Sequence, residues 1–314
     1  MSPSVNILIP TYNQAEHLTY AVQSALDQDY DDLQVIVSDD ASCDATESVL
    51  NRFSTNPRLL VNRNSHNLGR VGNYRKCLYE LATSDWVLIL DGDDYLCEKS
   101  YISDAIDTAR SNPAIDLVFA NAARLREDLD NQLQTSNENR GLPAVLEGRE
   151  LFLRLADQKI SLFHNTCLYK RQKACDLDFY RQDIISSDWE SLHRYILTGS
   201  IAFHAIDAAV WRLHHNNATR ALSVKQNIEN LNSITGPYEA AKAGHVFPEQ
   251  VLESWLEKRL WHAARKDVRA LLKAGDFKSY AAYMRNLKRT HKRVFQRIRY
   301  SPSLLIRNLR GRLR

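Results

Sequence analysis

Short apolar runs rich in β-branched residues alternate with segments of helical periodicity over the first hundred residues of the chain. The expected strands are residues 5–9, 33–37, 59–61 and 86–90, and the expected helices are residues 15–26, 44–53 and a segment that ends near residue 81. Strands that alternate with helices form βαβ units, so we predict an α/β fold with a mostly parallel, Rossmann-like sheet and flanking helices. Asp44 and Glu47 have the spacing of a capping box at the start of the second helix.

Polar and acidic side chains follow three of these strands where each strand is expected to end. They are Thr11, Tyr12 and Asn13 after the first strand, Asp39 and Asp40 after the second, and Asp91, Asp93 and Asp94 after the fourth. Ligands of parallel sheets bind at the carboxyl ends of the strands, so we expect these side chains to share one rim. Any one of them has an alternative explanation as a turn or helix cap, but three strand ends together favour a binding site.

The carboxylates of this rim repel one another and therefore call for a cation. Two acidic residues on the short loop Asp91-Gly92-Asp93 suit a hard divalent cation that keeps coordination positions open for phosphates. Such an ion neutralises charge on a phosphate leaving group. The chain has neither a GxxxxGK[ST] nor a GxGxxG motif, and no calcium-binding loop follows, which argues against P-loop NTPases, dinucleotide dehydrogenases and EF-hands.

Four motifs in a fixed order resemble those of the family 2 glycosyltransferases, whose nucleotide-sugar-binding domain has the GT-A fold. They are Pro10-Thr11-Tyr12-Asn13, Val37-Ser38-Asp39-Asp40-Ala41-Ser42 with Asp44 and Thr46, Asn67-Leu68-Gly69, and Leu90-Asp91-Gly92-Asp93-Asp94. The resemblance implies an inverting enzyme that moves a sugar from a nucleoside diphosphate donor, with a UDP-sugar favoured, to a saccharide or lipid-linked acceptor. It also implies a Mg²⁺ or Mn²⁺ cofactor.

The same resemblance assigns expected roles to the residues of these motifs. Pro10, Tyr12 and Glu16 would lie near the nucleoside, Asp39 and Asp40 would contact the base and ribose, and Asp91 and Asp93 would form the DxD motif, with Asp93 the first candidate metal ligand. Asp94 would instead contact the metal ligands from behind without binding the ion itself. Arg70 either reaches a phosphate or is a solvated loop arginine.

The acceptor side is expected within residues 161–220, where residues 161–169 could return a strand to the sheet. Ser187-Asp188-Trp189 is similar to the family's Glu-Asp-Trp segment, with Ser187 in place of the common Glu. Asp188 is the candidate general base, because the reaction needs a carboxylate that accepts the acceptor hydroxyl's proton; the alternative is a helix N-cap. Trp189 either stacks on a sugar or belongs to the core.

The segment that contains Arg212 and His214 resembles the family's closing Arg-x-His motif. His214 would complete the metal shell or bind the diphosphate, and its alternative role is that of a packed core histidine. We expect Arg212 to make a structural ion pair.

The net charge of +3 hides an uneven distribution along the chain. Residues 281–314 contain eleven Lys or Arg and no Asp or Glu, and subtracting these eleven charges leaves −8 for residues 1–280. Residues 249–274 and a segment from Phe277 have helical periodicity, with Gly275 between them, and after Pro302 leucines 305, 309 and 313 alternate with arginines. The tail 281–314 is predicted to bind an anionic membrane surface through a basic amphipathic helix; the alternative is an appendage docked on the protein, and nucleic acid is not expected.

These features define the expected organisation of the protein. Residues 1–222 would form the GT-A domain, with a nucleotide-sugar half 1–98 and an acceptor half 99–222, and residues 223–314 a C-terminal helical region. Composition excludes a disordered chain, and no apolar run approaches the length of a membrane-spanning helix. The first residues lack the pattern of a secretory signal, so we expect a cytoplasmic protein, peripheral on the inner face of the membrane.

Two further expectations concern cysteines and catalysis. The five cysteines form no CxxC pair, which indicates reduced thiols. The competing functional hypothesis is a non-catalytic protein of the same fold that binds a nucleotide sugar or scaffolds an assembly at the membrane; Ser187 is the feature that favours it.

Overall fold

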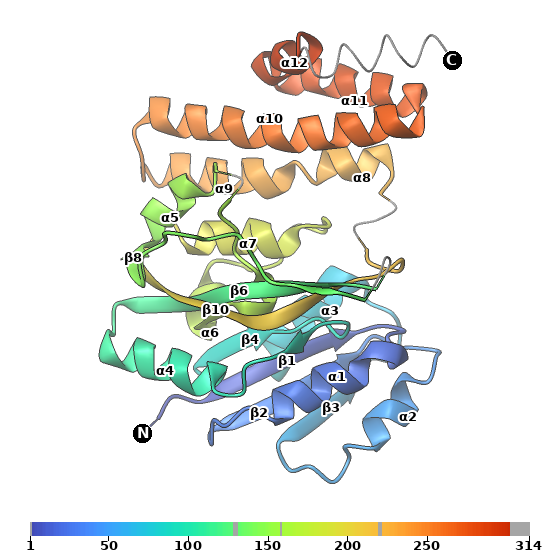
Figure 1. Ribbon diagram of the computed structural model, residues 1–314, viewed down its shortest axis with the longest axis vertical. Helices are drawn as coiled ribbons and strands as arrows, with labels where there is room; N and C mark the ends of the chain where they lie inside the picture. The colour runs from blue at the N-terminus through green and yellow to red at the C-terminus, as the bar shows by residue number, and fades with distance from the viewer. Residues whose placement is uncertain (1, 128–130, 158, 219–221, 302–314) are drawn as a thin grey trace. The chain divides into compact units, whose positions relative to one another are not determined.

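The computed structural model describes residues 2–127, 131–157, 159–218 and 222–301 (Figure 1). The chain divides into two compact units, one formed by Met1–Asp183 with Ser187–Asn217 and the other by Ile184–Ser186 with Ala218–Arg314. The predicted leucine and arginine repeat after Pro302 lies outside the described residues. No helix in the described part of the chain is long and apolar enough to cross a membrane.

The first unit is built on a ten-stranded mixed sheet. Its main order is β3 (Leu59–Arg63), β2 (Leu33–Asp39), β1 (Val5–Thr11), β4 (Trp86–Ile89), β9 (Leu168–Lys170), β6 (Ile115–Arg126), β10 (Ser200–Leu213) and β5 (Tyr95–Leu96), with β7 (Leu133–Gln134) on β6 and β8 (Val145–Glu147) on β10. Strands β1 to β4 pair in parallel, as do β6 and β10, whereas β9 joins these two groups in antiparallel register. The four strands expected from the sequence are confirmed.

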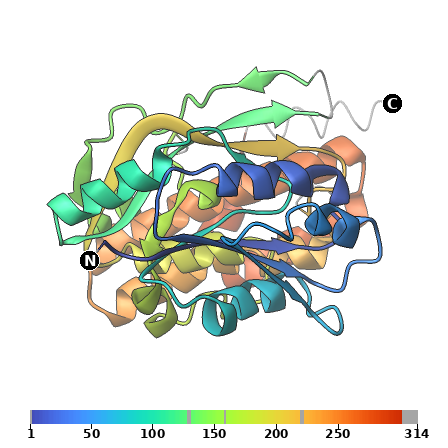
Figure 2. The same cartoon turned by 90° about the horizontal axis from the view of Figure 1, so that it is seen from below.

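Helices cover both faces of this sheet. They are α1 (Ala15–Leu26), α2 (Thr46–Asn51), α3 (Arg70–Lys76) continued by the π-turn η1 (Cys77–Leu81), α4 (Tyr101–Ser111), α5 (Gly148–Arg154), α6 (Arg171–Asp176) and α7 (Ser187–Tyr195). Helices α1 and α4 lie on one face and α3 on the other (Figure 2). The apolar stripe of α1, which includes Leu18 and Val22, packs with Ile7 and Val35 of the strands in one core. Burial of such alternating strand and helix faces drives this architecture.

The capping box expected at Asp44 and Glu47 is wrong. Helix α2 begins after Ala45 without a side-chain cap. The Asp44 carboxylate instead accepts hydrogen bonds from the backbone N–H groups of Thr46 and Ala15, both at 3.0 Å. Asp44 therefore ties α2 to the start of α1, a long-range role that its local spacing does not reveal.

The second unit is helical within the described residues. Its helices are α8 (Val224–Glu229), α9 (Asn232–Ala243), α10 (Glu249–Ala274), α11 (Phe277–Thr290) and α12 (Lys292–Arg299). Helix α10 ends at Gly275, which takes the left-handed conformation at φ 70° that glycine adopts without steric cost.

The apolar stripe of the basic segment is buried inside this unit. Leu287, Val294 and Ile298 are at most 3% exposed, and both α11 and α12 pack on α10. Arg293 and Arg297 lie 4.0 and 3.9 Å from glutamates of α10. Apart from Phe277, which is 54% exposed, residues 277–299 turn mainly charged and polar side chains to the solvent, and the stripe of Leu287, Val294 and Ile298 is not free to insert into a bilayer.

Candidate active site

The rim expected at the strand ends is present and is closely packed. Thr11 at the end of β1 is in register with Asp39 at the end of β2. The loop after β4 lies directly on the loop after β1, because a Cβ atom added at Gly92 would come within 2.6 Å of Gln14 Oε1 and 2.8 Å of Thr11 Oγ1. Glycine is therefore required at position 92 by this close approach of two of the sequence motifs.

The three residues expected near the nucleoside lie along this rim and differ in their exposure to solvent. Pro10 is buried within β1, Tyr12 is 48% exposed, and Glu16 is exposed in the first turn of α1. Tyr12 thus offers an aromatic face to the solvent at the end of β1. The hydrogen bond with Asp93 raises the pKa of the His214 imidazole, and the negative charge of Glu16 adds a smaller contribution in the same direction.

The two acids after β2 are almost completely buried and are held by hydrogen bonds. Asp40 Oδ1 accepts from Asn64 Nδ2 and from the Leu68 N–H, both at 2.8 Å. Asp39 Oδ1 accepts from the Ser42 N–H at 3.0 Å, and its Oδ2 lies 3.5 Å from Arg63 Nε. Asp40 therefore shapes the Asn-Leu-Gly loop, while Asp39 keeps an ion-pair partner at the edge of the rim.

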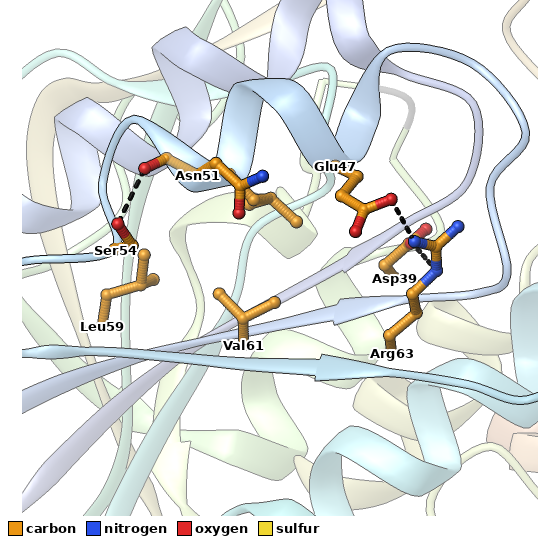
Figure 3. A pocket seen from close by; sticks show the side chains of 8 residues that line it. Asp39, Glu47, Asn51, Ser54, Leu59, Val61 and Arg63 are labelled. Atoms are coloured by element: carbon orange, nitrogen blue, oxygen red, sulfur yellow. Dashed lines mark hydrogen bonds and ion pairs between the residues drawn. The ribbon is translucent and has the colours of Figure 1, made fainter.

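A pocket of ≈ 330 Å³ lies between α2 and β3 on the outer side of Asp39 (Figure 3). Leu50, Leu59 and Val61 give it an apolar part. Its charged end is formed by Asp39 together with the ion pair of Glu47 and Arg63, whose side chains face each other at 2.5 Å. Tyr12 and the acids after β4 do not line this pocket, so it is separate from the DxD loop.

Arg70 is the cation that lies among the acids of the rim. Its guanidinium is 5.1 Å above the Tyr74 ring, and Nη2 donates to Ser187 Oγ at 3.4 Å. The Tyr74 hydroxyl in turn donates to Asp91. Burial alone would lower the pKa of Arg70, but the Tyr74 hydroxyl and the carboxylates of Asp188 and Asp91 outweigh it and raise that pKa. The alternative of a solvated loop arginine is therefore wrong.

Asp188 lies at the start of α7, beside this cation. Its side chain is 18% exposed, and Oδ2 is 3.9 Å from Nδ1 of the buried His164. Trp189, next to it, is 40% exposed, so it is not a core residue. Glu190 points away from the rim and is buried against Arg194. The first turn of α7 thus presents one partly exposed carboxylate and one aromatic side chain.

Asp93 pairs with His214 on the other side of the DxD loop. Asp93 Oδ2 is 2.9 Å from His214 Nε2, and this hydrogen bond raises the pKa of His214. The His214 ring stacks on that of His17 at 4.8 Å, and His17 Nε2 is 3.0 Å from Glu127. Neither His17 nor Glu127 is predicted from the sequence, because nothing in their local sequence marks them.

Two neighbours of this pair have structural roles. Asp94 is buried and accepts from the Arg212 N–H at 3.0 Å and from Asn165 Nδ2 at 2.9 Å. Burial, followed by the charges of Asp93 and Asp91, raises the pKa of Asp94 well above its usual value. The Arg212 guanidinium pairs with Glu127 at 2.6 Å, which confirms the expected structural ion pair.

The side chains of the rim that could hold a cation are Asp93, His214 and Asp91. Asp93 and His214 bring a carboxylate oxygen and an imidazole nitrogen together, and Asp91 keeps one oxygen beyond the one that accepts from Tyr74. No group of three His, Cys, Asp or Glu side chains with the arrangement of a metal site occurs among the residues that the structure describes. The pair fits an ion that takes its remaining ligands from phosphate and water, as Mg²⁺ does.

Comparison with known proteins identifies the relatives of this chain. Residues 6–175 match the protein-family model described as "Glycosyl transferase family 2". The chain is 33% identical over 91 residues to the Escherichia coli "UDP-Glc:alpha-D-GlcNAc-diphosphoundecaprenol beta-1,3-glucosyltransferase WfaP", which is 29% of this chain and 36% of that protein. It is 33% identical over 124 residues to the Campylobacter jejuni "GalNAc(5)-diNAcBac-PP-undecaprenol beta-1,3-glucosyltransferase", which is 38% of each. The chain therefore spans little more than a third of the length of these relatives.

Solved structures give the same fold. Staphylococcus aureus TarS 1–349 in complex with UDP-GlcNAc superimposes with a TM-score of 0.71 at 16% identity, over 93% of this chain and 82% of that one. The mannosyltransferase PcManGT from Pyrobaculum calidifontis in complex with GDP-Man and Mn²⁺ gives a TM-score of 0.58 at 16% identity, over 92% and 76% of the two chains. At this identity the likeness concerns the fold, and it confirms the predicted GT-A architecture with its C-terminal helices.

Proposed function

The chain belongs to glycosyl transferase family 2, and from this premise we propose that it transfers a sugar, with inversion, from a UDP-sugar to a saccharide or lipid-linked acceptor, with Asp188 as the general base. The observation that carries the proposal is the position of Arg70. This one guanidinium lies among Tyr74, Asp91 and Ser187, and its pKa responds to both Asp91 and Asp188. This arrangement supports a single site that contains both the proposed donor-side carboxylate Asp91 and the proposed acceptor-side carboxylate Asp188.

The donor would bind along the rim. Pro10, Tyr12 and Glu16 would lie near the nucleoside, and Asp39 and Asp40 would contact its base and ribose. The proposed divalent ion, Mg²⁺ or Mn²⁺, would be held by Asp93, Asp91 and His214, and when bound it supplies positive charge to the diphosphate. Because Asp93 and His214 share a hydrogen bond, binding of the ion has to displace the proton between them.

The chain's own residues would perform the proton transfer. The acceptor oxygen attacks the anomeric carbon from the side opposite the diphosphate, a new C–O bond forms, and the bond to the phosphate oxygen breaks with its electron pair. Asp188 accepts the hydroxyl proton as this oxygen attacks. Arg70 stays charged beside the site and stabilises negative charge on the departing diphosphate. Trp189, which is 40% exposed, would stack on a sugar ring of the acceptor.

The test is turnover of the full chain with a panel of donors. Thermal shift with Mn²⁺ selects among UDP-glucose, UDP-N-acetylglucosamine and GDP-mannose, and nucleotide release then measures turnover. Asp93→Ala should abolish metal-dependent turnover, and Asp188→Asn should lower kcat by about 10²–10⁴-fold with donor affinity unchanged. Asp107→Asn, an exposed α4 residue outside the site, is the matched control. Wild-type turnover by Asp188→Asn with normal donor binding would show that Asp188 is not the base.

A second candidate function is a nucleotide-sugar-binding or scaffold protein of the same fold. The substitution of Ser187 for the common Glu favours it. The full chain would then bind UDP-sugars without metal-dependent release of UDP on any acceptor, including undecaprenyl-linked saccharides.

Peripheral membrane binding from the cytoplasmic side belongs to the same proposal. The exposed basic residues of 281–301 are Arg285, Lys288, Arg289, Lys292, Arg293, Arg297 and Arg299. Since their helices bury the apolar stripe, contact with anionic lipid would be electrostatic and would weaken with salt. In this scheme residues 1–98 bind the donor and residues 99–222 the acceptor, and residues 281–314 of the helical region 223–314 carry the membrane contact.

Vesicle sedimentation of the full chain tests this part. The wild type should pellet with phosphatidylglycerol-containing vesicles but not with neutral phosphatidylcholine vesicles, and Lys288→Glu with Arg289→Glu should reduce pelleting. Absence of pelleting with anionic vesicles at low salt would refute the membrane contact and leave the transferase proposal intact.

A further inference from the structure

A buried histidine and tyrosine stand behind the carboxylate assigned as general base. His164 lies in the 3₁₀ turn η2 (His164–Thr166) before β9, and its Nε2 is 3.1 Å from the Tyr180 hydroxyl. Its other ring nitrogen, Nδ1, is 3.9 Å from Asp188 Oδ2. We propose that Tyr180 and His164 are positioning residues for Asp188: the tyrosine hydroxyl fixes the imidazole so that its Nδ1–H faces the base. This inference rests on the proposed function, because it assigns a role relative to that base.

In this proposal the Tyr180 hydroxyl is the donor of the hydrogen bond and His164 Nε2 is its acceptor. Tyr180 is 1% exposed, and burial raises its pKa well above the usual value, so its hydroxyl keeps its proton. A hydroxyl that donates to Nε2 leaves the single proton of a neutral imidazole on Nδ1. That proton then points toward the Asp188 carboxylate. The separation of 3.9 Å exceeds a hydrogen bond, and such contacts often tighten when substrate binds.

Tyr180 is held in an unusual backbone conformation, and helix α7 holds it there. Its φ is +59° and that of Asp178 is +49°, a left-handed region that bulky side chains rarely adopt. Ser191 Oγ accepts from the Tyr180 N–H at 2.8 Å, and Arg194 Nη2 donates to the Asp178 carbonyl at 3.0 Å. Conformations of this kind cluster at functional sites because the surrounding structure has to maintain them.

These contacts start from helix α7 and return to Asp188 on the same helix. Helix α7 carries Asp188 in its first turn, and further along it carries the serine and arginine that fix the 178–180 segment. That segment places the Tyr180 hydroxyl on His164, which faces Asp188 again. Residues of helix α7 thus fix the segment that orients the carboxylate at the start of the same helix. Partners behind a reactive side chain commonly fix its orientation in this way.

Two substitutions of the histidine separate its two nitrogens. His164→Gln keeps a polar group for Tyr180 but loses the one that faces Asp188, whereas His164→Asn keeps the group nearer Asp188 and loses the contact with Tyr180. We expect kcat of the full chain, with the donor selected above, to fall about 10- to 100-fold in His164→Gln and less in His164→Asn and Tyr180→Phe. KM for the donor and the affinity for UDP with Mn²⁺ should stay within about twofold of wild type.

His204→Gln is the matched control, because His204 contacts Thr108 at 3.0 Å and lies outside the site. A wild-type kcat in His164→Gln, or an equal loss in His204→Gln, would overturn the inference while the transferase function stands. If His164→Gln does not fold, the kcat of Tyr180→Phe is compared with that of His204→Gln instead. A wild-type kcat in Tyr180→Phe would then overturn the inference.

A second measurement does not depend on turnover. The ¹⁵N spectrum of the histidine-labelled full chain, with His164 assigned from its substituted variant, reports which ring nitrogen carries the proton. We expect the Nδ1–H form in the wild type and a loss of this preference in Tyr180→Phe. The Nε2–H form in the wild type would overturn the inference. If no donor is turned over at all, the proposed function fails, and this spectrum still decides whether the tyrosine fixes the histidine.

Discussion

Replacement of Glu190 by alanine should destabilise the first unit by about 3–5 kcal/mol, because it leaves a buried arginine without its carboxylate. The Glu190 side chain is 0% exposed and that of Arg194 is 4% exposed. Arg194 binds both carboxylate oxygens, through Nε at 2.8 Å and Nη2 at 3.0 Å, and Arg181 adds a contact at 2.9 Å. Water cannot replace the lost partner at such a site, so the desolvation cost of the guanidinium is no longer offset.

Urea unfolding measures this loss. With a denaturant slope of about 2–3 kcal/mol per M, a loss of about 3–5 kcal/mol lowers the unfolding midpoint by roughly 1–2.5 M. The same change should weaken the hold of Arg194 on the Asp178 carbonyl and thus on the segment that carries Tyr180. Any loss of turnover in this variant should therefore accompany its loss of stability.

The chain contains a matched control in Glu150 and Arg154. They have the same i,i+4 spacing and a distance of 2.6 Å, but their side chains are 49% and 42% exposed. Exposed pairs of this kind contribute about 0.3–0.5 kcal/mol, so Glu150→Ala should barely move the midpoint. Equal shifts in the two variants would refute the reasoning, since burial is the difference on which it depends.

Three further predictions concern packing, pH and the helical unit. Gly92→Ala should lower the free energy of unfolding by about 1–3 kcal/mol and weaken UDP binding measured by calorimetry, because its methyl group would clash with Thr11. An unchanged affinity for UDP would contradict the close packing of the rim. Burial raises the pKa of Asp116, but hydrogen bonds from two lysines outweigh it, and its net pKa is lowered. Its stabilisation is thus complete above the unfolded pKa of about 3.9 and is lost as pH falls through the lowered value, so the stability difference between wild type and Asp116→Asn should shrink between pH 5 and pH 2. Arg297→Ala removes a guanidinium 4.4 Å from the Trp261 ring and should lower stability by about 0.5–2 kcal/mol, with a change in tryptophan fluorescence as the second reading.

The part of the fold that the sequence predicts well is the part built from local patterns. Strand β1 and helix α1 are consecutive, short and strongly periodic, and α1 has the bounds Ala15–Leu26 that the periodicity indicates. The rim follows from these elements, because the carboxyl ends of parallel strands meet at one edge. Asp44 shows where local reasoning ends, since its spacing suggested a helix cap and its longer-range partner is the Ala15 N–H, 29 residues away.

The acceptor half depends on contacts that no local pattern encodes. The parallel pair β6 and β10 contains register irregularities between Ser200 and Ala209, which break the alternation that identifies a strand. Glu127 meets His17 across 110 positions of the sequence and meets Arg212 across 85. Such partners are set by the topology of the sheet, so only the folded structure reveals the histidine stack behind Asp93.

Ser187 shows how the structure changes the meaning of a sequence departure. Considered alone, serine in place of the common glutamate favoured a non-catalytic protein. In the structure the Ser187 hydroxyl accepts from Arg70, whose charge also acts on Asp91 and Asp188. A glutamate at this position would place another anion beside that guanidinium and would draw its charge away from the two aspartates. The hydroxyl binds Arg70 without adding charge, so the departure alters the partner of the cation and is no argument against Asp188 as a base.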